Sequence, residues 1–163
     1  MTQATLHSAT ADAVLQTAIQ MEELGKDFYD ALAAAIGDHP TVELCRKLAA
    51  AEVGHLAVFR QMRSELAHRG ETVLLPDCQL AEARRVAKHT VLPDQDAICR
   101  MVSAGDVEQL FEMAIGMENE SVRFYRMLAG QLPDPAAVDG VIREEEEHVR
   151  LLSAARTRHG GAM

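Results

Sequence analysis

The sequence is poor in the residues that several classes of protein depend on. None of its 163 residues is tryptophan, only 4% are aromatic, and the 16 Lys and Arg are outnumbered by 25 Asp and Glu. A formal charge of −9 argues against nucleic-acid binding, which requires a basic surface. No apolar run approaches the roughly 18 residues of a membrane-spanning helix. We therefore expect neither a nucleic-acid partner nor a membrane partner.

Cysteine is also scarce. The three cysteines are odd in number, far apart and without a C-x-x-C pair, which argues against a disulfide framework or a zinc ribbon. The first ten residues lack the basic and apolar regions of a secretion signal. Together these features predict a cytoplasmic protein. The length suits a single domain, which we place at residues 1–163.

Helical periodicity extends over most of the chain. We expect two helix pairs, at residues 10–69 and 106–158, and the short loop within each pair makes an antiparallel hairpin. Residues 70–105 form a long crossover with two shorter helices, and Asp106 with Gln109 suggests a capping box at its end. Because a crossover of this length lets the second and third long helices run parallel, the pattern predicts an all-α fold, a ferritin-like antiparallel four-helix bundle.

An internal repeat relates the two helix pairs. The segments Ala18–Tyr29 (AIQMEELGKDFY) and Ala114–Tyr125 (AIGMENESVRFY) are identical at six of twelve positions. A Glu-x-x-His element is repeated as well, at Glu52–His55 and again at Glu145–His148. Because the repeat preserves polar residues as well as apolar ones, packing alone does not explain it, and we expect the repeated polar residues to have a chemical role.

The repeated polar residues interrupt the apolar seams of the long helices. Core positions recur along each helix in alternating steps of three and four, and the middle of every seam is Glu, or Glu with His. Residues three apart share a helix face, so each Glu-x-x-His can hold one ion. Four carboxylates and two imidazoles match the ligands of a two-metal site in a bundle. The predicted metal ligands are Glu22, Glu52, His55, Glu118, Glu145 and His148.

The charge of these side chains favours metal binding over the alternative that they lie on solvated faces. Four carboxylates buried without counterions would be very costly or would become neutral, whereas two divalent ions cancel four negative charges. The polar residues also interrupt the apolar seam of each long helix at nearly the same distance from the helix start, and the pattern occurs in both helix pairs. Residues on a solvated surface would not be expected to show this regularity. Because Glu52 and Glu145 each share a face with a His, we expect them to bridge the ions, with Glu22 and Glu118 terminal.

Two tyrosines are duplicated on the same seams. Tyr29 and Tyr125 lie two turns beyond Glu22 and Glu118. We expect their hydroxyls to bond to a ligating side chain and to support the site, with a backbone partner as the alternative. Side chains without a seam position are assigned to the solvated surface, among them Glu120, Glu144, Glu146, Glu147 and His159.

The repeated A-I-x-M-E-x(5)-F-Y block and the two Glu-x-x-His elements resemble the rubrerythrin branch of the ferritin-like superfamily. The resemblance covers about residues 12–155. It implies two iron ions in a non-haem site that reacts with hydrogen peroxide or dioxygen, and hence an oxidoreductase of the peroxidase or ferroxidase type. An iron–manganese pair or two manganese ions are the alternatives, since carboxylate and imidazole suit both metals. The resemblance also implies a homodimer.

Two differences separate this sequence from rubrerythrins proper. Those proteins carry a rubredoxin domain with paired C-x-x-C elements, which are missing here, so we expect a separate electron donor. They also have a further glutamate on the third long helix, where this chain has Ser121.

Iron storage of the bacterioferritin type and a metal-stabilised structural bundle are the alternative functions. Bacterioferritin resembles this chain in its ligand set, but its crossover is shorter. It also has a haem-ligating Met where this chain has Val53, so no haem is expected.

Overall fold

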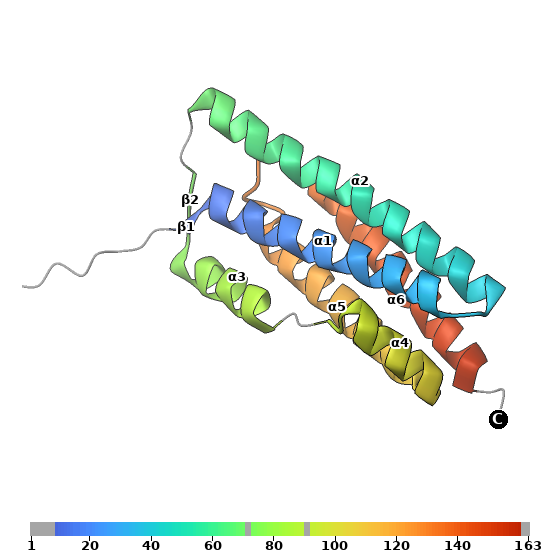
Figure 1. The fold of residues 1–163 in the computed structure, drawn as a ribbon. Coiled ribbons are helices and arrows are strands. Elements are labelled where there is room, and N and C mark those ends of the chain that lie inside the picture. Colours follow the sequence, from blue (N-terminus) through green and yellow to red (C-terminus); the bar gives the residue numbers. More distant parts are fainter. Residues whose placement is uncertain (1–8, 71–72, 90–91, 161–163) are drawn as a thin grey trace, which may run out of the picture.

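The computed structural model describes residues 9–70, 73–89 and 92–160, and almost all of them are helical (Figure 1). The elements in chain order are β1 (Ala9–Thr10), α1 (Ala11–Ala35), α2 (His39–Arg69), β2 (Leu74–Leu75), α3 (Asp77–His89), α4 (Gln95–Ala104), α5 (Val107–Leu128) and α6 (Pro135–Gly160). Helices α1, α2, α5 and α6 form the bundle. The all-α prediction is confirmed. Within the described ranges, no helix combines the length and the apolar character needed to cross a membrane.

Two hairpins make up the bundle. Helix α1 packs along α2, and α5 packs along α6, while the crossover helices α3 and α4 lie against α1 and α5. Figure 1 shows that the crossover runs along the bundle, so that α2 and α5 point in the same direction. The predicted arrangement of two hairpins joined by a long crossover with short helices is therefore confirmed.

The helix starts follow the capping residues of the sequence, with one exception. Thr10, Asp38 and Asp134 each accept a hydrogen bond from the backbone N–H three residues further on, at 3.0–3.3 Å. Asp106 precedes α5, but its side chain makes no capping hydrogen bond, so the predicted capping box with Gln109 is wrong. The backbone at Asp106 (φ −81°, ψ 31°) lies outside the extended region that an N-cap residue normally adopts.

A short β ladder at one end of the bundle was not predicted. Strand β1 pairs antiparallel with β2, with Ala9 opposite Leu75 and Thr10 opposite Leu74. The ladder joins the start of α1 to the start of the crossover. Strands of two residues are too short to show the alternation of apolar and polar residues by which a strand is recognised in a sequence.

The last turn of α6 contradicts one surface assignment. His159 Nε2 lies 2.9 Å from Thr41 Oγ1, and its ring centroid lies 5.3 Å from that of Phe111. His159 therefore joins the end of α6 to the start of α2. Helical periodicity could not reveal this contact, because His159 and Thr41 are 118 positions apart.

The apolar core consists of two clusters on either side of a polar layer. One cluster contains Leu15 and Phe59, and the other contains Leu32 and Phe111. Along α1, Glu22 lies between Leu15 and Leu32, and it is only 2% exposed. Close packing on both sides sets the register of the four helices. The charged side chains in the middle of each seam are therefore forced together.

Candidate metal centre

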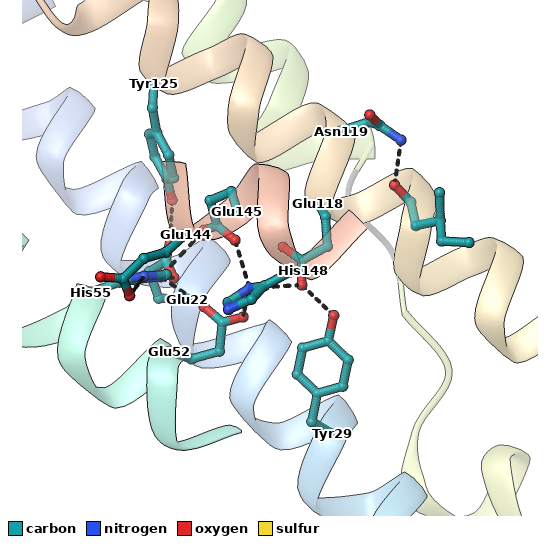
Figure 2. A network of polar contacts seen from close by, with 11 residues as sticks. Glu22, Tyr29, Glu52, His55, Glu118, Asn119, Tyr125, Glu144, Glu145 and His148 are labelled. Carbon is teal, nitrogen blue, oxygen red and sulfur yellow. Dashed lines mark hydrogen bonds and ion pairs between the residues drawn. The ribbon is translucent and has the colours of Figure 1, made fainter. Parts of the chain in front are cut away.

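Six buried polar side chains meet at the middle of the bundle (Figure 2). Each of them is at most 5% exposed. They come from all four long helices: Glu22 from α1, Glu52 and His55 from α2, Glu118 from α5, and Glu145 and His148 from α6. The structure thus brings together all six of the predicted ligands.

The six side chains form two overlapping groups, each able to hold one metal ion. The first group is Glu22, Glu52, His55 and Glu145, and the second is Glu52, Glu118, Glu145 and His148. Within each group the candidate ligand atoms lie within 4.8 Å of one another. Only Glu52 and Glu145 belong to both groups. This sharing is the geometry expected of two bridging carboxylates, with one terminal carboxylate left for each ion.

Both imidazoles turn the same ring nitrogen toward the carboxylates. The Nδ1 atom of His55 lies 3.1 Å from Glu22 Oε2 and 3.3 Å from Glu145 Oε1. The Nδ1 atom of His148 lies 3.0 Å from Glu145 Oε2 and 3.5 Å from Glu118 Oε1. The two ring centroids are 5.7 Å apart. Nδ1 is therefore the nitrogen that each histidine would offer to an ion held by these carboxylates.

Two tyrosine hydroxyls connect the hairpins through the unshared carboxylates. Tyr29 of α1 donates to Glu118 Oε1 on α5, and Tyr125 of α5 donates to Glu22 Oε1 on α1 (Figure 2). Burial, reinforced by the nearby carboxylates, raises the pKa of both phenols well above the usual value. Each phenol therefore keeps the proton that it donates to its carboxylate.

The crowding of charges changes the proton affinity of the cluster. Burial raises the pKa of Glu52 and of Glu145 well above the usual value, and neighbouring carboxylates raise it further. Burial alone would raise the pKa of Glu22, but hydrogen bonds with Glu52 and His55 lower it. Burial alone would lower the pKa of His55, but hydrogen bonds with Glu145, Glu22 and Glu52 raise it. Protons and cations thus compete for the same buried atoms.

One buried oxygen of the cluster has no hydrogen-bond partner. It is Oε1 of Glu52, a residue that is 2% exposed. A buried acceptor without a partner costs on the order of 1–3 kcal/mol, and a cation at the cluster would satisfy it. Four carboxylates and two imidazoles are donors that suit iron and manganese. The residues present therefore fit a dinuclear metal centre.

Gly25 lacks a side chain at a position that faces the Glu52 carboxylate. A Cβ atom added to Gly25 would lie 3.3 Å from Met117 Cε and 3.5 Å from Glu52 Oε1. The repeat counterpart of Gly25 is Ser121, which is also small and is 4% exposed. A larger side chain at Gly25 would press on the carboxylate that both groups share.

One side chain that contacts the cluster was not predicted from the sequence. Glu144 was assigned to the solvated surface, and its side chain is indeed 62% exposed, but its Oε2 atom lies 3.1 Å from His55 Nε2. Glu144 lies off the α6 seam, so the spacing of core positions gives no sign of it. A histidine that binds metal through one nitrogen usually needs an acceptor for the other. This requirement is the signal by which Glu144, the residue before Glu145, could have been found in the sequence.

Comparisons with known proteins agree with this geometry. A solved structure from Thermotoga maritima, described as a ferritin-like diiron-carboxylate protein, matches with a TM-score of 0.67 and 21% sequence identity. The match covers 93% of this chain and 97% of that one, which confirms the ferritin-like fold. Curated proteins gave no match. The rubrerythrin family model matches residues 13–156, and the chain therefore belongs to the rubrerythrin family.

Proposed function

We propose that this protein is a di-iron oxidoreductase that reduces hydrogen peroxide or dioxygen at the six-residue cluster. The observation that carries the proposal is the pair of overlapping groups, which place one imidazole and one unshared carboxylate on each side of two shared carboxylates. Six protein ligands for two ions, two of them shared, leave coordination positions open. An open position distinguishes a reactive metal site from a closed structural one.

The chemistry of peroxide reduction requires two electrons and two protons. When bound, two ferrous ions would give one electron each, so that the O–O bond breaks and two molecules of water form with two added protons. The sequence has no C-x-x-C element for a second redox centre. The two electrons are returned by a donor other than the di-iron site, either a small reductant or an electron-transfer protein.

The protein's own residues prepare the site for this reaction. The hydroxyls of Tyr29 and Tyr125 hold the unshared carboxylates of Glu118 and Glu22 from across the bundle. The apolar clusters above and below the polar layer limit the access of water. In such surroundings, fixed charges and dipoles act more strongly than they do in water.

Stopped-flow oxidation of the ferrous-loaded protein by peroxide tests the proposal. We expect the wild type to bind about two iron ions per chain and to oxidise them faster than free ferrous ion is oxidised in the same buffer. Glu118→Ala should lose most of this acceleration because it removes an unshared carboxylate. Glu112→Ala is the matched control on α5, since that side chain is 58% exposed and pairs only loosely with Arg156, at 3.5 Å.

Each alternative gives a different result in the same experiment. If the wild type oxidises iron no faster than free ferrous ion, the enzymatic proposal fails and the site has a structural role. Uptake of many iron ions per chain, together with a native mass of a large cage, would favour storage of the bacterioferritin type.

A further inference from the structure

The two imidazoles of the cluster differ in what their outer ring nitrogen contacts. The Nε2 atom of His55 faces Glu144 Oε2 at 3.1 Å, across the interface between α2 and α6 (Figure 2). In the described part of the chain, the carboxylates near His148 are all found on its inner nitrogen, Nδ1. The two halves of the site are therefore unequal, although the six ligands themselves are duplicated.

The internal repeat traces this inequality to one residue. The offset that places Glu52 on Glu145 and His55 on His148 places Ala51 on Glu144. A carboxylate at position 51 would occupy, beside His148, the place that Glu144 occupies beside His55. Ala51 has only a methyl group, which cannot accept a hydrogen bond.

The outer nitrogen matters because of how histidine binds metal. A neutral imidazole that offers Nδ1 to a cation carries its proton on Nε2, and this proton needs an acceptor. A carboxylate acceptor fixes the orientation of the ring and makes the inner nitrogen a stronger donor to the metal. Loss of such a partner typically weakens metal binding about 10–100-fold. Because Glu144 is 62% exposed, we expect the lower end of that range.

We propose that Glu144 is a positioning residue for His55, and that it makes the two metal positions unequal, with the tighter one at His55. The inference rests on the proposed metal centre and states in which order its two sites bind metal ions. The first ion occupies the group that contains His55, and the second completes the pair at His148.

Anaerobic titration with Co²⁺ tests the proposal without depending on activity. We expect the wild type to bind two ions with dissociation constants that differ by about tenfold. Glu144→Ala should weaken the tighter step about tenfold, so that the two constants become similar. Glu144→Gln should weaken it less, because an amide oxygen can still accept the hydrogen bond.

A matched control separates positioning from a general effect of charge. Glu147→Ala removes a negative charge from the same helix, but the Glu147 carboxylate bonds to Arg150 at 2.8 Å. We expect this variant to bind both ions as the wild type does. Equal weakening in Glu147→Ala and Glu144→Ala would overturn the proposal, since it would show a long-range effect of charge.

The repeat also allows a test by gain of function. Ala51→Glu places a carboxylate at the position equivalent to Glu144, where it can accept the outer N–H of His148. We expect the weaker Co²⁺ step to tighten severalfold. In the proton NMR spectrum of the cobalt-loaded protein, the ring N–H signal of His148 should then exchange with solvent more slowly. Glu144→Ala should speed the same exchange for His55.

The outcomes distinguish the inference from the proposed metal centre. If the wild type takes up no Co²⁺ at the cluster, the metal centre itself fails. If it binds two ions but Glu144→Ala leaves both constants and both N–H exchange rates unchanged, the metal centre stands and the role of Glu144 is wrong. Glu144 is exposed, whereas Ala51 and Glu147 are half-buried, so the melting temperature of every variant is measured to identify any loss of fold.

Discussion

Two equivalents of ferrous or manganous ion are expected to raise the melting temperature of the protein by about 10–20 °C. At concentrations 100 times the dissociation constant, each bound ion stabilises the folded state by about 2.7 kcal/mol, or roughly 5 kcal/mol for two ions. For a chain of this length, 1 kcal/mol corresponds to about 2–4 °C. The stabilisation arises because the ions pair with carboxylates that folding otherwise buries at a cost. Differential scanning calorimetry with and without a chelator measures the effect.

The stabilisation by metal is also expected to grow with pH. The folded-state pKa values of Glu52, Glu145 and His55 are raised, and a raised pKa contributes stability at low pH that is lost as the pH rises through it. The pKa of Glu22 is lowered, so its contribution is present above the usual value of 4.5 and is lost only at lower pH. Between about pH 5 and 8 the metal-free protein should therefore lose stability as the pH rises.

Metal binding has the opposite dependence on pH. Ions compete with protons for the carboxylates and for His55, so the metal-loaded protein should gain affinity over the same range. A metal-induced shift of less than about 2 °C at every pH would contradict the dinuclear centre. A metal-free protein whose stability rises steadily from about pH 5 to 8 would contradict the raised pKa values of Glu52, Glu145 and His55.

Replacing Glu52 with alanine is expected to abolish the two-metal centre. Glu52 belongs to both ligand groups and has the one buried cluster oxygen without a hydrogen-bond partner, so its loss affects both ions. We expect metal content to fall from two ions per chain to one or fewer. Affinity for the ion that remains should fall by about 100-fold or more, since loss of a supporting residue alone typically costs 10–100-fold. Equilibrium dialysis followed by elemental analysis gives the count.

Glu23→Ala is the control for this experiment. Glu23 is the neighbour of Glu22 on α1, but its side chain is 48% exposed and pairs with Arg60 at 2.7 Å. An exposed ion pair contributes about 0–1 kcal/mol to stability, so this variant should fold and should retain two ions. Equal metal content in the two variants would show that the ligand assignment is wrong.

The features that helical periodicity could predict are those that repeat along one face of a helix. Leu15, Glu22 and Tyr29 lie on one seam of α1, and burial of the apolar positions determines where the glutamate must lie. The repeat then places Glu118 at the same depth on α5. Two hairpins and a long crossover follow from loop length, because short loops permit only antiparallel neighbours.

Contacts between side chains at the edges of the helices could not be predicted in this way. Glu144 reaches His55 from outside the seam, and His159 meets Thr41 through the relative placement of two helix ends. Both contacts depend on the tertiary arrangement rather than on the period of one helix. The same holds for the β1–β2 ladder, where two segments that are distant in the sequence pair through their backbones. The missing cap at Asp106 reflects a backbone conformation that residue type alone does not determine.

Anomalous diffraction at the iron edge, from crystals loaded anaerobically with ferrous ion, tests the dinuclear centre most directly. Two peaks are expected, roughly 3.5–4 Å apart, as in other two-metal sites. One should lie at Nδ1 of His55 and the other at Nδ1 of His148, with Glu52 and Glu145 next to both. A single peak within the cluster, or iron bound only outside it, would contradict the assignment of these six side chains to a two-metal site.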